Sequence, residues 1–305
     1  MQMSIIERAL EKLQQGTRKP QPGEAPSSRV PRSVGRRDNV TDAPVRPAAR
    51  PHEVRPPAQT SPVTVEQLRR GGALPPEEHA STLTDQFRRI KWPILEAAVG
   101  RDSADGRPAN RVMVTSSIAG EGKTFTSFNL AHSIAREKDF SVLLVDADVA
   151  KRHATELFKL EERQGLTDVI ADPSLDAETL VIGTGIPGLC VLPAGRRSNA
   201  APELFASQRM AEIVEQLGRH DPHRIVLFDS SPLLATNESQ VLAKIVDQVV
   251  LVVRAEFTTQ PMVLEAIALL DKSKQIRCVL NQARASRMTE YYYGYGYYPN
   301  DRTQE

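Results

Sequence analysis

The sequence predicts an α/β fold in which a mainly parallel sheet is flanked by helices. Two observations support this prediction. Several short runs are apolar throughout, which is typical of parallel strands buried on both faces, and helical stretches separate them. The expected strands are 111–116, 141–146, 189–193, 224–229, 248–253 and 276–281, and the expected helices between and after them are 123–137, 202–218, 237–245 and 259–272.

Four regions are expected along the 305 residues. They are a short amphipathic helix in 1–16, a disordered Pro/Arg-rich linker over 17–80, a folded domain over 81–285 and a flexible Tyr-rich tail over 286–305. Ser4 and Glu7 form a capping box for the first helix, which is either frayed or a docking helix for a partner. The linker is expected because proline-rich segments without aromatic residues bury too little apolar surface to fold.

Composition limits the function classes. A hydrophobic content of 40% supports a sizeable core, and a formal net charge of +1 gives no reason to expect a nucleic-acid partner. The two cysteines, Cys190 and Cys278, stand in apolar runs, so we expect buried thiols in a reducing compartment. No signal peptide or run of about 18 apolar residues is visible, which predicts a cytoplasmic protein.

The first expected strand leads directly into a loop that is typical of phosphate binding, SSIAGEGKTF. Glycines allow backbone amides to surround phosphate oxygens at a helix N-terminus, a lysine reaches the terminal phosphates and a hydroxyl meets Mg²⁺. A chance glycine-rich turn is the alternative. The expected nucleotide-binding residues are Ser117, Ala119, Gly120, Glu121, Gly122, Lys123, Thr124 and Phe125, with Ser117 in place of the first glycine of the usual motif.

Two further apolar strands end in aspartate. LLVDAD supplies Asp146 and Asp148, and LFDSSP supplies Asp229. The carboxyl ends of parallel strands are where open α/β sheets bind ligands, and carboxylates there suit a hydrated Mg²⁺ on a triphosphate. These residues therefore extend the predicted nucleotide site.

Together, GEGKT, LLVDAD and LFDSSP resemble the bacterial tyrosine kinases, which have a P-loop NTPase fold. The segments MSIIERALEKL and FRRIKWPIL and the tyrosine-rich end resemble more narrowly the autokinases of exopolysaccharide and exosortase systems. The resemblance implies an ATP- and Mg²⁺-dependent protein-tyrosine kinase, with further nucleotide contacts near Arg254 and Asn281. Positioning ATPases of the same fold carry a lysine where this chain has Ile118, which argues against their type of switch.

The sequence departs from the family pattern in three places. Ala119 and Ser231 stand where prolines are usual, and Ala150 stands where the family has an arginine, with Lys151 following it.

All six tyrosines of the chain lie in its tail, at positions 291, 292, 293, 295, 297 and 298. Two other interpretations of this tail are a low-complexity aromatic segment that associates non-specifically and a surface on which single-stranded nucleic acid stacks. Because the tail follows a domain with a predicted ATP site, we expect its tyrosines to be the phosphoacceptors. They are Tyr291, Tyr292, Tyr293, Tyr295, Tyr297 and Tyr298.

A tyrosine hydroxyl titrates near pH ~10 and needs a base during phosphoryl transfer. Asp146 is the expected base, Asp148, Asp229 and Thr124 would hold Mg²⁺, and Lys123 would neutralise developing charge, although the carboxylates could exchange these roles.

The resemblance also implies partners. Related kinases form homo-oligomeric rings through an E-x-x-R-x-x-R helix, whose register here is Asp85, Arg88 and Lys91, on one face of an expected helix over 83–95. A membrane polysaccharide co-polymerase, or chain-length determinant, would activate the kinase at the inner membrane, and a cognate phosphatase would reset it. A P-loop ATPase switch and a nucleotide-binding pseudo-kinase are the alternatives.

Overall fold

The computed structural model describes residues 59–75, 77–100 and 107–283, all within one compact unit of the chain. The helix expected in 1–16, most of the linker and the six tyrosines lie outside the described residues. Within these ranges no helix is long and apolar enough to cross a membrane.

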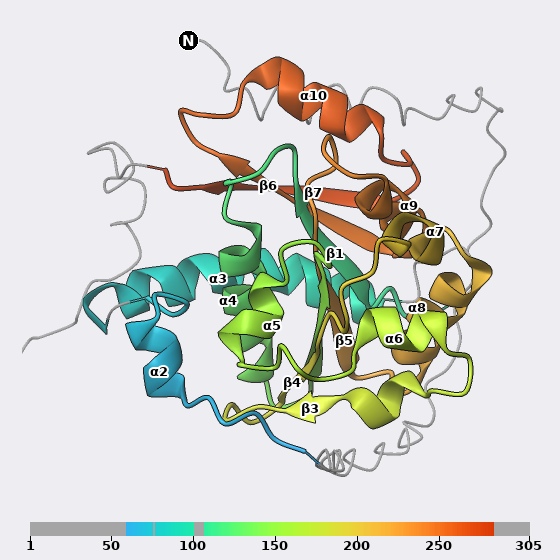
Figure 1. The fold of residues 1–305 in the computed structure, drawn as a ribbon. Coiled ribbons are helices and arrows are strands. Elements are labelled where there is room, and N and C mark those ends of the chain that lie inside the picture. Colours follow the sequence, from blue (N-terminus) through green and yellow to red (C-terminus); the bar gives the residue numbers. More distant parts are fainter. Residues whose placement is uncertain (1–58, 76, 101–106, 284–305) are drawn as a thin grey trace, which may run out of the picture. The chain divides into compact units, whose positions relative to one another are not determined.

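A seven-stranded sheet forms the centre of the fold, in the order β3-β4-β2-β5-β1-β6-β7 (Figure 1). All neighbouring strands are parallel except β3, which is antiparallel to β4. The predicted mainly parallel sheet is therefore confirmed. The strands are β1 (Arg111–Ser116), β2 (Ser141–Ala147), β3 (Ile182–Gly183), β4 (Leu189–Leu192), β5 (Arg224–Ser230), β6 (Gln248–Arg254) and β7 (Gln275–Asn281).

Helices pack on both faces of the sheet because alternate strand residues point to opposite sides. Val112 and Val114 of β1 belong to one apolar cluster, and Met113 belongs to the other. The first cluster includes α2 (Val65–Arg70), α3 (Glu77–Val99), α4 (Lys123–Ala135) and α5 (His153–Leu157). The second includes α6 (Leu166–Ala171), the 3₁₀ helix η1 (Ala177–Leu180), α7 (Ala201–Phe205), α8 (Gln208–Arg219), α9 (Asn237–Ile245) and α10 (Gln260–Ala268).

The helix expected over 202–218 is two helices, α7 and α8. The break falls at Ser207, whose Oγ accepts a hydrogen bond from the backbone N–H of Met210 at 3.3 Å and so caps α8. No elements were expected between 147 and 188, where α5, α6, η1 and β3 form. Cys190 and Cys278 are free and half-buried, and burial raises the pKa of both thiols.

The predicted linker is too long, because the folded domain begins well before residue 81. Val63, Leu68 and Leu74 are buried in the core cluster that contains α3 and α4. Ser61 Oγ donates a hydrogen bond to the carbonyl of Phe158 at 2.8 Å, and Thr64 caps α2. These few apolar residues bury enough surface to fix the segment although its neighbours are rich in proline.

The expected charged face on α3 is wrong at one of its three positions. Asp85 and Arg88 form an exposed ion pair at 2.9 Å. Lys91, however, is only 5% exposed, and its Nζ donates to the carbonyl of Ser133 at 2.8 Å and lies 2.6 Å from Glu137 Oε1. Lys91 therefore attaches α3 to α4 within the domain, because a buried ammonium requires fixed acceptors.

Candidate active site

The predicted functional residues gather at the carboxyl ends of β1, β5 and β2, which are adjacent in the sheet. The loop after β1 leads into α4, and Asp146 of β2 lies directly opposite Asp229 of β5 in the strand register. Both aspartates are fully buried. The parallel sheet thus places three chain segments at one edge, as in other ligand sites of open α/β sheets.

Two glycines shape the phosphate loop. Gly120 and Gly122 have φ of 84° and 89°, in the left-handed region that favours glycine, and α4 begins at Lys123. A Cβ added at Gly122 would lie 2.1 Å from Nδ2 of Asn281. The loop therefore depends on glycine both for its backbone angles and for the close approach of the strand end beside it.

Glu121 fixes this loop to a neighbouring strand. Its buried carboxylate accepts hydrogen bonds from the backbone N–H of Ile118 at 2.7 Å, the backbone N–H of Arg254 at 3.2 Å and Thr258 Oγ1 at 2.5 Å. Asn281 Nδ2 donates to the Glu121 carbonyl at 2.9 Å. A buried carboxylate with three donors is well satisfied, so this side chain holds the loop in place.

Arg254 and Asn281, expected near the nucleotide, therefore both contact the phosphate loop itself. The guanidinium of Arg254 lies 4.5 Å from the ring centroid of Phe257, which is half exposed. This cation–π pair therefore lies next to the phosphate loop, at the end of β6.

The lysine of the loop lies beside one of the aspartates. Lys123 Nζ is 4.0 Å from Asp148 Oδ2, and both side chains are almost fully buried. Ser231 Oγ donates to Asp148 Oδ1 at 3.0 Å. The serine that departs from the family pattern therefore adds a hydrogen bond to this carboxylate.

Asp229 has an oxygen that suits a metal ion. Ser127 Oγ donates to its Oδ1 at 2.9 Å, whereas its buried Oδ2 has no hydrogen-bond partner. Burial raises the pKa of Asp229 to about 6, against the opposing effect of the nearby Thr124 and Ser127 hydroxyls. An unpaired carboxylate oxygen near the Thr124 hydroxyl is the type of ligand set that a hydrated Mg²⁺ prefers.

Asp146 has the protonation behaviour of a base. Burial, and after it the negative charge of Asp229, raise the pKa of Asp146 to about 7. Its Oδ2 accepts from both the backbone N–H and the hydroxyl of Thr155, each at 2.7 Å, and its Oδ1 accepts from the backbone N–H of Asp148 at 3.2 Å. A carboxylate held in one orientation with a pKa near neutrality is suited to accept a proton.

The remaining loop residues differ in what they offer. Ser117 is buried and its Oγ has no hydrogen-bond partner, whereas Ala119 is exposed. The ring of Phe125 packs 6.5 Å from that of Phe87, so its side chain belongs to the core and only its backbone amide can face a phosphate.

Sequence reasoning missed several hydroxyl residues of the site. Ser127, Thr155 and Thr258 each donate a hydrogen bond to one of its buried carboxylates. Only Ser127 carries a sequence signal, since it lies one helical turn after Lys123 on α4 and therefore on the same face.

Two other features lie outside this arrangement. Within the described ranges no group of three His, Cys, Asp or Glu side chains forms a metal site by itself.

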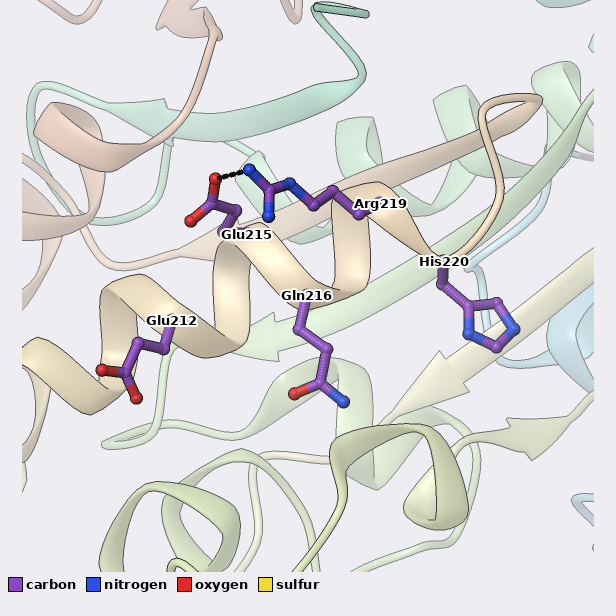
Figure 2. Close-up of a pocket in the computed structure, with 5 residues that line it drawn as sticks. All are labelled: Glu212, Glu215, Gln216, Arg219 and His220. Carbon is purple, nitrogen blue, oxygen red and sulfur yellow. Dashed lines mark ion pairs between the residues drawn. The ribbon is translucent and has the colours of Figure 1, made fainter.

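An open pocket on α8 is lined by Glu212, Glu215, Gln216, Arg219 and His220, with Arg219 and Glu215 paired at 2.6 Å (Figure 2). It contains none of the predicted functional residues.

Replacing Gly122 with alanine is expected to abolish nucleotide binding. The new Cβ would collide with Asn281, and the strained φ would add about 1 kcal/mol or more. Gly72→Ala is the matched control, because Gly72 also has a positive φ, of 75°, but a Cβ there would meet nothing within 4 Å. The measurement is titration with a fluorescent ATP analogue, and equal affinities in the two variants would contradict the collision.

Comparisons with known proteins show which family the chain resembles. A family described as an AAA domain matches residues 110–282. The tyrosine-protein kinase YwqD of Bacillus subtilis is 34% identical over 221 residues, which cover 71% of this chain and 89% of YwqD. The VpsO kinase domain has a TM-score of 0.56 and 28% identity, covering 68% of this chain and 100% of that domain. The kinase domain of Escherichia coli ETK has a TM-score of 0.55 and 25% identity, covering 67% and 78%.

Proposed function

The chain belongs to the bacterial tyrosine-protein kinases, and from this premise we propose that it transfers the γ-phosphoryl group of ATP to tyrosines in the tail of a second copy. The observation that carries the proposal is the buried carboxylate of Asp146, at the same carboxyl ends of the strands as the phosphate loop. Hydrogen bonds from Thr155 and Asp148 orient it, and its pKa is about 7. A tyrosine hydroxyl needs such a base because its own pKa lies near ~10.

The residues of the chain would divide the work as follows. Asp146 accepts the proton of the tyrosine hydroxyl while the tyrosine oxygen forms a bond to the γ-phosphorus. The bond from the γ-phosphorus to the bridging oxygen breaks, and ADP leaves. Lys123 and the amides of the phosphate loop hold the phosphates in line with that oxygen. Thr124, Asp148 and Asp229 would hold Mg²⁺, which when bound neutralises charge on the β- and γ-phosphates.

The acceptors in this proposal are Tyr291, Tyr292, Tyr293, Tyr295, Tyr297 and Tyr298. The resemblance to exopolysaccharide-associated autokinases supports a regulatory role in the synthesis or export of such polymers. A membrane co-polymerase would activate the kinase at the cytoplasmic side of the inner membrane, and a phosphatase would reverse it. A homo-oligomeric ring would use the exposed Asp85–Arg88 pair, without Lys91.

Transfer between molecules predicts a specific labelling pattern in a mixture of two variants. One is Lys123→Met, with an intact tail, and the other has all six tyrosines replaced by phenylalanine and an intact site. Labelled ATP should give phosphotyrosine only on the Lys123→Met chain, as read by mass spectrometry of the separated proteins. Each variant alone should remain unlabelled.

Two other outcomes would contradict the proposal. If the mixture stays unlabelled while the wild-type chain labels its own tail, transfer occurs within one molecule. If the wild-type chain hydrolyses ATP and labels no tyrosine, the P-loop ATPase switch becomes the better description.

A further inference from the structure

Three cations lie on the rim of the catalytic edge and take no part in the mechanism above. Lys151, Arg196 and Arg197, here called the cationic rim, are all exposed. Lys151 belongs to the turn that follows Asp148, whose carbonyl accepts from the Lys151 backbone N–H at 3.1 Å. Arg197 comes from the loop after β4, and its Nη1 donates to the carbonyl of Ala150 in the same turn at 3.2 Å. The cationic rim therefore joins two loops next to the catalytic aspartates.

The backbone beneath these cations is fixed. Thr155 Oγ1, which donates to Asp146, also accepts from the backbone N–H of Ala194 at 2.9 Å. Asp168 Oδ2 accepts from the backbone N–H of Gly165 at 2.9 Å and of Arg196 at 3.1 Å. The loop after β4 is thus attached to the proposed base through one hydroxyl, and it is rigid enough to present charged side chains in a constant place.

The charges of the cationic rim are largely unused by the domain. Arg196 Nε lies 3.7 Å from Asp168 Oδ1, but 80% of the arginine side chain remains exposed. Lys151 contacts Asp148 through its backbone N–H, and the residue is exposed. Exposed pairs of this kind contribute little to stability, so the three cations remain available to a ligand.

The position of the cationic rim indicates which ligand it meets. The phosphate loop follows β1, whereas the rim lies beside β2 and β4, which are two and three strand positions away in the order β4-β2-β5-β1. With about 4.8 Å between strands, the end of β4, which leads to Arg196 and Arg197, lies about 14 Å from the end of β1. The turn that carries Lys151 is closer to the phosphate loop, since Lys123 Nζ lies 4.0 Å from Asp148 Oδ2. Arg196 and Arg197 therefore lie beyond Asp146 on the side away from the phosphate loop, where a protein substrate would extend.

We propose that the cationic rim binds a phosphotyrosine of the tail that is being phosphorylated, so that one phosphorylation promotes the next. This inference rests on the proposed function. The acceptors are one or two residues apart along 291–298, so when one is at Asp146 a neighbour is within about 3.5–7 Å along an extended chain. A phosphotyrosine carries about −1.5 to −2 charges and pairs strongly with arginine.

The test compares two peptides of residues 288–300 as substrates. One has phosphotyrosine at position 293, and the other has Tyr293→Phe, so that both offer the same five acceptors. The enzyme is the full chain with its own six tyrosines replaced by phenylalanine. The phosphorylated peptide should show a KM lower by about five- to tenfold, as expected for one or two charge-assisted contacts.

Variants of the cationic rim should remove this preference. In Lys151→Gln/Arg197→Gln the ratio of kcat/KM between the two peptides should fall to about one. Lys151→Arg/Arg197→Lys, which keeps both charges, should retain most of the ratio. Arg219→Gln on α8 (Figure 2) is the matched control, because it removes an exposed arginine that precedes the amino end of β5 and not the carboxyl ends of the strands, and it should leave the ratio intact.

Binding of the two peptides without ATP, followed by fluorescence anisotropy, separates this inference from the proposed function. Binding that favours the phosphorylated peptide and is lost in the Gln variant supports the rim, even if neither peptide is phosphorylated and the kinase proposal fails. Equal binding of both peptides overturns it. So does competition by inorganic phosphate at concentrations equal to the peptide, or a rim variant that changes only the KM for ATP.

Discussion

Replacing Lys123 with methionine is expected to lower tail phosphorylation by about a hundredfold to a thousandfold, the usual effect of removing a preorganised charge from a reacting phosphate. Lys123 is 6% exposed and its Nζ lies 4.0 Å from Asp148 Oδ2, in a site where two further carboxylates are fully buried. Methionine keeps an unbranched apolar side chain of nearly the same length and removes the ammonium with its charge and hydrogen-bond donors. Phosphotyrosine formed from labelled ATP is the measurement.

The control for this experiment is Lys272→Met, which removes an exposed lysine outside the site. Lys123→Met should also retain the thermal unfolding profile of a folded domain, because Asp148 keeps its hydrogen bond from Ser231. Wild-type labelling by the folded Lys123→Met protein would remove the phosphate loop from the mechanism.

Asp229→Asn is expected to stabilise the nucleotide-free protein while it abolishes activity. In the folded state the pKa of Asp229 is about 6, above its ordinary value of 3.8. Ionisation of this buried carboxyl therefore lowers stability progressively between about pH 4 and pH 6, and the full penalty remains at higher pH. Asparagine has no such penalty and can keep the hydrogen bond from Ser127.

The gain should be about 1–3 kcal/mol above pH 6 and should vanish below pH 4. Thermal unfolding in EDTA between pH 4 and pH 8 measures it. Asp247→Asn is the contrasting variant, because Asp247 accepts three hydrogen bonds from Arg111 and its loss should destabilise the domain. If Asp229→Asn is also destabilised at pH 8, the penalty assigned to its burial is wrong.

The sequence predicts the central strands and the aspartates at their ends better than the short elements of the fold. β1, β2, β5 and β6 each contain an uninterrupted apolar run, so these strands can be predicted without any tertiary information. By contrast, β3 has two residues and α5 has five, too short for a period to be read.

Two charged residues show why the remainder of the site could not be predicted. Glu121 reads as a polar residue of an exposed loop, and its burial depends on donors from Arg254 and Thr258, more than 130 positions away. Lys91 fits a charged helical face, and only the packing of α4 supplies its acceptors, Ser133 and Glu137. Helical spacing predicts which face of the helix a side chain occupies, but it does not predict the residues of other elements that this side chain contacts.

The two ends of the described domain leave the sheet at opposite edges. On one side Thr60 pairs with Gly183 of β3, and on the other the chain departs after β7 (Figure 1). Across seven strands these edges are about 30 Å apart. An anchor that binds the chain ahead of residue 59 would therefore hold the domain by the β3 side of the sheet. The β7 side, where the described residues end and the proposed acceptor segment follows, would remain accessible to a neighbouring molecule.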